Sequence, residues 1–163
     1  MHPPPGQVGL RHGPRRPALI LFLDTSALVK LYIAEPGSER MRSVVALGEP
    51  MAASVLAFAE IHATLARRRR EALLRPPELA QLQQAFALDW EELTQVSASL
   101  AVLQLVPGLC ARHPLRGADA VHLASALLLH QEGLRVTFAC SDRDLVGAAA
   151  AEGLLTFDPV ASA

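Results

Sequence analysis

Two aspartates follow directly after apolar, strand-like stretches of the sequence. Asp24 comes after LILFL at residues 19–23, and Asp142 comes one serine after RVTFAC at residues 135–140. Either carboxylate alone is the ordinary N-cap of the next helix, because Asp accepts hydrogen bonds from the free N–H groups of a first turn. Two strands that end alike nevertheless predict two carboxylates at one edge of a parallel sheet, where ligands collect in such folds.

Two more acids lie within helix-like segments. Asp119 stands near the start of RGADAVHLASAL, whose apolar residues indicate a largely buried helix. An acid at the mouth of a buried helix needs a partner, and a metal ion is one candidate. Glu60 lies about two turns into SVLAFAEIHATLARRRR, away from the main apolar stripe of that helix, so a solvent-facing position stays open for it. Its small neighbours, such as Ala57 and Ala63, favour close packing on more than one side.

The four acids together favour a hard divalent cation. Carboxylates packed side by side repel and raise one another's pKa values unless a cation lies between them. Oxygen ligands of this kind suit Mg²⁺, with Mn²⁺ as an alternative. Cys110 and Cys140 form no CxxC pair, which predicts two buried, reduced thiols rather than a disulfide or a zinc site.

An alternation of strands and helices must position these acids. Parallel strands joined by helices indicate an α/β fold with helices on both faces of the sheet. We expect the helix after residue 97 to be interrupted near Pro107 and Gly108, and the last helix to start with Ser141 as its cap and Asp144 as the partner in a capping box. Strands are predicted at residues 19–23, 51–53, 94–97, 135–140 and 154–157. Helices are predicted at 26–33, 38–47, 54–70, 75–93, 116–133 and 141–153, with the interrupted helix ending at the RHP of residues 112–114.

Composition limits the classes of protein that this chain can be. Its 163 residues suit one domain, predicted at 18–160, and the Pro-, Gly- and Arg-rich residues 1–17 are predicted to form a flexible N-terminal arm. The 15 basic and 16 acidic residues nearly balance, which argues against a uniformly basic nucleic-acid-binding surface. No apolar run is long enough to span a bilayer, so we expect no membrane association and a cytoplasmic location.

Four segments of the chain match a known family in order: LDTSALVKLY with EPGSE, then AFAEIHATLARR, LRGADAVHLASAL and SDRDLVGAAAAEGL. Through these segments the chain resembles the PIN-domain ribonucleases, most closely the VapC-type toxins of type II toxin–antitoxin pairs. The resemblance implies a three-layer α/β/α fold with a mainly parallel sheet of four or five strands, and an endoribonuclease that depends on Mg²⁺. It also implies an RNA substrate, a cognate antitoxin and a homodimer.

The resemblance also assigns roles to single residues. The catalytic and metal-binding acids would be Asp24, Glu60, Asp119 and Asp142. Ser26 would support the first acid, whereas Ser141 and Asp144 would be helix-cap residues or, for Asp144, an auxiliary acid. We expect a water activated by the metal to attack the phosphodiester in line, which leaves 5′-phosphate and 3′-hydroxyl ends.

Arginines offer a second set of contacts. Arg67, Arg68, Arg116 and Arg143 could bind RNA phosphates or acids of an antitoxin, although a solvated helix end favoured by the dipole is the preferred explanation of the run at 67–70. The histidines, His122 among them, are interpreted as surface or packed residues rather than as bases.

Two other classes stay open at this point. One is a catalytically inactive PIN-like protein that only binds RNA or an antitoxin. The other is a Mg²⁺-dependent phosphotransfer domain, which also places an Asp after a strand. The dehalogenase type needs a second Asp two residues later, where this chain has Ser26.

Overall fold

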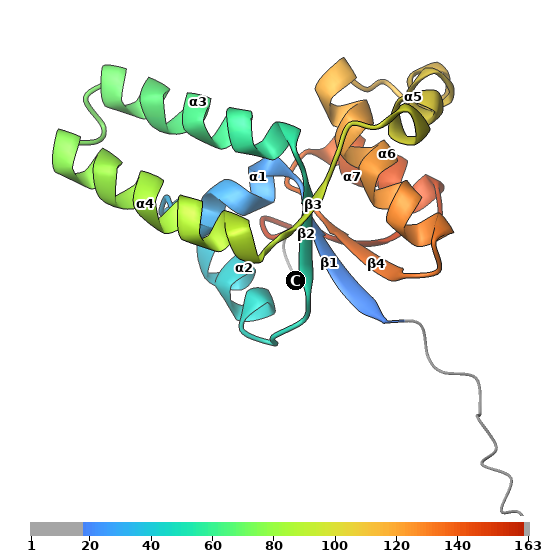
Figure 1. Ribbon diagram of the computed structural model, residues 1–163, viewed down its shortest axis with the longest axis horizontal. Coiled ribbons are helices and arrows are strands. Elements are labelled where there is room, and N and C mark those ends of the chain that lie inside the picture. The colour runs from blue at the N-terminus through green and yellow to red at the C-terminus, as the bar shows by residue number, and fades with distance from the viewer. Residues whose placement is uncertain (1–17, 162–163) are drawn as a thin grey trace, which may run out of the picture.

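All the strands that the structure describes run parallel in one sheet (Figure 1). The structure is a computed structural model that describes residues 18–161, so the predicted arm at 1–17 lies outside the described residues. Neighbouring strands follow the order β3-β2-β1-β4-β5. The strands are β1 Leu19–Leu23, β2 Met51–Ser54, β3 Thr94–Val96, β4 Arg135–Ala139 and β5 Leu155–Phe157.

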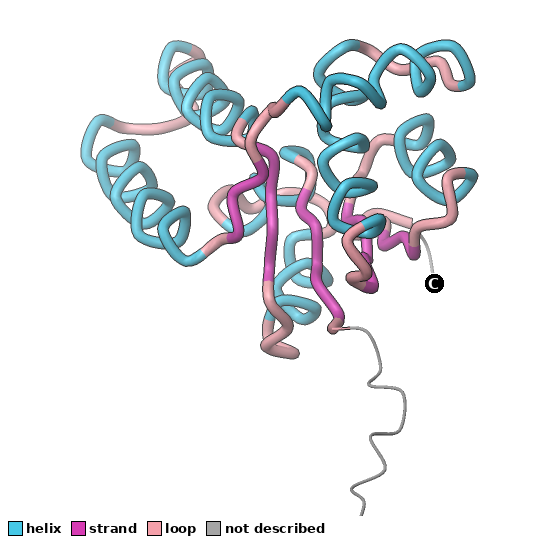
Figure 2. Tube along the Cα trace, turned by 45° about the vertical axis from the view of Figure 1, so that its right-hand side comes forward, coloured by secondary structure: helices cyan, strands magenta, loops and turns pink. Residues whose placement is uncertain are grey.

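Helices cover both faces of this sheet and complete the three layers (Figures 1 and 2). The first four helices pack on one face and the last three on the other, so the predicted α/β/α class is confirmed. The helices are α1 Thr25–Leu28, α2 Ser38–Val45, α3 Leu56–Arg70, α4 Pro76–Glu92, α5 Leu100–Arg112, α6 Gly117–Gln131 and α7 Arg143–Ala151, with a 3₁₀ turn at Val29–Leu31.

Strand β1 is apolar throughout because both of its faces are buried. Ile20 and Phe22 point into the core under α5, α6 and α7. Leu21 and Leu23 point the other way, into the core formed with α1 to α4. Phe22 stacks on Phe138 of β4 with 5.5 Å between the ring centroids, which joins the two central strands. The end of β1 is therefore fixed from both sides.

The topology of the sheet places a crevice at the end of β1. From β1 the chain continues to β2 on one side, and it later returns to β4 on the other. Such a reversal leaves a gap at the carboxyl ends of the two strands, where open α/β sheets bind ligands. Leu23 pairs with Ala139, so the segments that follow β1 and β4 leave the sheet at the same level. The backbone N–H of Asp24 donates to the Ala139 carbonyl across 3.0 Å.

Three local predictions are wrong. Helix α5 is not interrupted near Pro107 as predicted. Pro107 has no N–H to donate to the Leu103 carbonyl, but the helix continues through it. Helix α7 is capped by Asp142 and not by Ser141, because Asp142 is extended and its side chain accepts from Leu145 N–H. Cys110 is exposed, since α5 turns its neighbour Leu109 inward.

No helix within residues 18–161 has both the length and the apolar character needed to cross a bilayer.

Candidate active site

Asp24 is held rigidly at the end of β1. Its carboxylate is almost fully buried, and Oδ2 accepts hydrogen bonds from the N–H of Ser26 at 3.1 Å and from the Ser26 hydroxyl at 2.7 Å. The same hydroxyl accepts from Ser141 N–H at 2.9 Å, so Ser26 also ties the segment after β4 to α1. Two strand ends are thereby fixed through one serine.

Cys140 fills the space between the two strand-end acids. Its thiol lies 3.5 Å from Asp24 Oδ2, and its sulfur accepts the N–H of Asp142 at 3.2 Å. Burial, together with the negative charge of Asp24, raises the pKa of the Cys140 thiol far above its ordinary value. The thiol is therefore neutral and serves as packing and as a weak hydrogen-bond partner.

Glu60 reaches the same region from α3 through a histidine of α6. His122 Nε2 lies 2.8 Å from Glu60 Oε1 and 3.4 Å from the Thr25 hydroxyl of α1. The hydrogen bond from His122 lowers the pKa of Glu60 against the opposing effect of partial burial. Glu60 is thus an ionised carboxylate at neutral pH, with about 39% of its side chain exposed.

His122 brings three of the four predicted acids together. Its ring is 1% exposed, and burial alone would lower its pKa. The hydrogen bond to Glu60 and the charges of Asp24, Glu60 and Asp119 outweigh that effect, so the pKa of His122 is raised. Three acids, which follow β1 or belong to α3 and α6, therefore raise the pKa of one imidazole. The sequence was interpreted as giving His122 a surface or packed position; its spacing of three residues from Asp119, on one helix face, was the available signal.

Asp119 lies in the first turn of α6 and has a cation beside it. The Nε–H of Arg116 donates to Asp119 Oδ2 across 3.2 Å, and the Arg116 side chain is largely exposed. The charge of Arg116 also lowers the pKa of Glu60. The mouth of the site thus combines carboxylates with one solvent-facing guanidinium.

Asp142 is held by a different set of contacts from the other three acids. Its Oδ1 accepts from Leu145 N–H at 3.0 Å as the cap of α7. Arg143 and Asp144 follow on the exposed start of α7, and the buried hydroxyl of Ser141 has no partner among the described residues.

The acids fit a hard cation by their chemistry, although they do not form a ready ligand set. Asp24, Asp119 and Asp142 each use one carboxylate oxygen in the hydrogen bonds given above and present a second oxygen. Such oxygens are the ligands that Mg²⁺ prefers. Within residues 18–161, however, no three His, Cys, Asp or Glu side chains lie close enough together to hold a metal ion. The four-carboxylate magnesium site stays a prediction.

One of the four arginines at the end of α3 forms an ion pair, and the other three are exposed. Arg68 Nη2 lies 3.1 Å from Glu35 Oε2, and the other oxygen of Glu35 accepts from the buried Lys30 at 2.7 Å. Arg67 is exposed at the same end of α3, as are Arg69 and Arg70. Arg68 is therefore restrained, whereas its neighbours are free to meet solvent or a polyanion.

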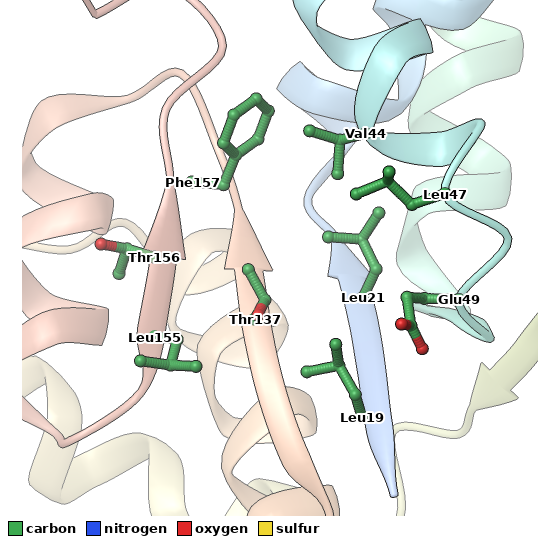
Figure 3. Close-up of a pocket in the computed structure, with 9 residues that line it drawn as sticks. All are labelled: Leu19, Leu21, Val44, Leu47, Glu49, Thr137, Leu155, Thr156 and Phe157. Carbon is green, nitrogen blue, oxygen red and sulfur yellow. The ribbon is translucent and has the colours of Figure 1, made fainter. Parts of the chain in front are cut away.

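An apolar pocket lies elsewhere on the sheet. Its cavity of about 350 Å³ opens between β1, β4, β5 and the end of α2, and Leu21, Leu47 and Phe157 are among its lining residues (Figure 3). Glu49 is the charged residue at its rim, and the four acids are not among the lining residues. This pocket is separate from the candidate active site.

Comparison with known proteins assigns the family. A model of the PIN domain matches residues 21–150. The chain is 37% identical over 134 residues to Ribonuclease VapC45 of Mycobacterium tuberculosis strain CDC 1551 / Oshkosh, which covers 82% of this chain and 92% of the relative. Ribonuclease VapC49 of M. tuberculosis strain H37Rv matches to the same extent.

Solved structures agree with this fold at low sequence identity. A toxin–antitoxin complex from Klebsiella pneumoniae superposes with a TM-score of 0.61 at 16% identity, over 85% of this chain and 97% of that one. FitAcB from Neisseria gonorrhoeae gives a TM-score of 0.62 at 18% identity, over the same shares of the two chains. With a family model over most of its length and relatives of matching length, this chain belongs to the PIN-domain family, in its VapC-type branch.

Proposed function

We propose that this protein is a metal-dependent endoribonuclease and the toxin of a VapC-type toxin–antitoxin pair that acts in the cytoplasm. One observation carries the proposal: at the carboxyl edge of the sheet, Glu60 of α3 and Asp24 after β1 lie 2.8 Å and 3.9 Å from the two ring nitrogens of one buried side chain, His122. The relatives at 37% identity are named ribonucleases, which supports RNA as the substrate.

Asp24, Asp119 and Asp142 would hold Mg²⁺, with Glu60 as a further ligand or as the residue that orients the attacking water. A bound Mg²⁺ supplies Lewis-acid activation of water and stabilises charge on the phosphate oxygens. Ser26 holds the Asp24 carboxylate in one orientation. Little side-chain conformational entropy is therefore lost when Asp24 binds the cation. Glu60, ionised at neutral pH, can accept a hydrogen bond from water beside the phosphate.

RNA must approach these acids despite its own charge. Arg116 is the best-placed phosphate contact, because its exposed guanidinium lies beside Asp119. Arg143 starts α7 next to Asp142, and Arg67 lies farther along α3. Arg68, restrained by Glu35, contributes less. These contacts would reduce repulsion and add salt-dependent affinity.

A cognate antitoxin is the expected protein partner. The similar solved structures include complexes of a toxin with an antitoxin, which supports this assignment. We also expect a homodimer, which the molar mass in solution tests directly: a monomer at micromolar concentration would contradict it.

RNA cleavage with purified protein tests the proposed activity. We expect cleavage in Mg²⁺ that stops with EDTA, and a fall of about a hundredfold or more for Asp119→Asn. Glu132→Gln is the matched control, because Glu132 is exposed at the opposite end of α6. An Asp119→Asn protein as active as the wild type would refute the proposal. A wild type that binds RNA without cutting it would point instead to the inactive RNA-binding alternative.

A further inference from the structure

We propose that His122 is a positioning residue that fixes the carboxylate of Glu60 and sets which of its oxygens faces the site. The inference rests on the proposed function of the same site. It assigns to the imidazole a role in organising the acids, beyond filling the core between α6 and the sheet.

The contacts of His122 join elements from both faces of the sheet. The ring belongs to α6, while its Nε2 contacts Glu60 of α3 at 2.8 Å and Thr25 of α1 at 3.4 Å. In Figure 1, α6 lies on one side of the sheet, and α1 and α3 lie on the other. One buried side chain therefore bridges the two helical layers at the carboxyl edge.

The hydrogen bond to Glu60 has a fixed direction. An ionised carboxylate can only accept, so Nε2 must carry the hydrogen that it donates to Oε1. Glu60 has several rotatable bonds and a side chain that is partly open to solvent. Without this donor the carboxylate would sample many orientations. With Oε1 held by His122, Oε2 is the oxygen left to meet a cation or water.

The other ring nitrogen argues against a purely packing role. Nδ1 is buried without a hydrogen-bond partner among the described residues, and it lies 3.9 Å from Asp24 Oδ1. A core position that needed only volume would be served better by leucine, since an unpaired buried polar atom is unfavourable. The ring instead stands between the Asp24 and Glu60 carboxylates and keeps them at a defined separation.

Substitutions at position 122 can separate donation from volume. His122→Leu fills the space without a donor, whereas His122→Gln places an amide N–H within reach of Glu60. We expect calorimetry to show Mn²⁺ affinity at least tenfold weaker in the Leu variant and within threefold of wild type in the Gln variant. For RNA cleavage, the Leu variant should lose kcat at least tenfold while KM changes less than twofold. Thermal melting shows that each variant is folded.

A double-mutant cycle with Glu60→Gln completes the test. If His122 acts through Glu60, adding His122→Leu to Glu60→Gln should weaken Mn²⁺ binding by less than twofold further. A full further tenfold loss, or Leu and Gln variants that bind Mn²⁺ equally well, would overturn the inference. If His122→Leu does not fold, His122→Asn, whose amide is too short to reach Glu60, takes its place in the cycle.

The outcomes also separate this inference from the nuclease proposal. A wild type that cuts no RNA, but whose Mn²⁺ affinity still depends on the donor at position 122, would refute the nuclease and support the positioning role. A wild type that binds no Mn²⁺ would overturn the positioning role.

Discussion

Asp24 and Asp142 occupy equivalent places after neighbouring parallel strands, yet the fold treats them differently. Asp24 is 5% exposed and is held by Ser26 and Cys140 with His122 opposite. Asp142 is half-buried and makes the ordinary capping bond to Leu145 N–H. Both are helix caps, but only Asp24 shares its surroundings with Glu60 and Asp119 through His122. The strand-end position therefore brings an acid to the edge, and the neighbouring helices decide its chemical environment.

The largest expected effect is the difference between the two Asp→Asn variants. Asp24→Asn should lower the rate of RNA cleavage about a thousandfold, and Asp142→Asn about tenfold to a hundredfold. Asn also caps helices well, so neither change should melt the helix that follows. Single-turnover cleavage at saturating Mg²⁺ measures both. Equal losses would mean that Asp142 belongs to the site as closely as Asp24.

Removing the support of Asp24 should have a smaller effect. Ser26→Ala deletes the hydroxyl that donates to Asp24 and accepts from Ser141 N–H. We expect the free energy of unfolding to fall by about 1–2 kcal/mol and cleavage to slow about tenfold. Ser43→Ala is the matched control, because that exposed hydroxyl bonds only its own helix at Glu39. Unchanged cleavage in Ser26→Ala would show that Asp24 needs no such support.

The pair of Glu60 and His122 should give the metal-free protein a pH window of extra stability. The lowered Glu60 pKa stabilises the fold above the ordinary value of 4.5, and this gain is lost as the pH falls through the folded pKa. The raised His122 pKa stabilises the fold below 6.5, and that gain is lost as the pH rises through its folded pKa. Both contributions to the stability of the fold are complete only between pH 4.5 and pH 6.5.

Urea unfolding in EDTA checks this window. The difference in free energy of unfolding between the wild type and Glu60→Gln should be greatest between pH 4.5 and pH 6.5 and should decline on either side. A difference that is constant from pH 4 to pH 9 would contradict the coupling between these side chains.

The smallest effect concerns the two thiols. Cys110 is exposed, whereas Cys140 is buried between the two strand-end acids with a strongly raised pKa. Iodoacetamide at pH 8 should therefore label Cys110 and spare Cys140 until urea unfolds the chain. Mass spectrometry of the peptides reports both sites. Equal labelling in the native protein would mean that the segment after β4 opens readily.

The sequence predicted the sheet better than it predicted the contacts at its edge. The apolar run of β1 and the alternating residues of β4 fix their own strands, and right-handed parallel connections then place Asp24 and Asp142 at one edge. The prediction of an interrupted helix at Pro107 was wrong because tertiary packing tolerates a proline that the local backbone preference disfavours. The capping pattern at Ser141 and Asp142 contained two candidate caps, and only the backbone conformation distinguishes between them.

The pairing of Glu60 with His122 could not be read from local pattern. These residues are 62 positions apart, and their contact depends on how α3 and α6 are rotated about their axes on opposite sides of the sheet. Helical periodicity placed Glu60 off the main apolar stripe of its helix, but it could not identify the residue of another helix that Glu60 contacts. Likewise, Arg68 differs from its neighbours only because Glu35 lies beside it in the fold.

Anomalous diffraction from crystals soaked in Mn²⁺ tests most directly whether these acids form one cation site. We predict a single strong peak, or two peaks close together, bounded by the carboxylates of Asp24, Asp119 and Asp142, with Glu60 or a water completing the shell. Asp24→Asn crystals should lose the density. A peak elsewhere on the molecule, or none at these three side chains at millimolar Mn²⁺, would contradict the account.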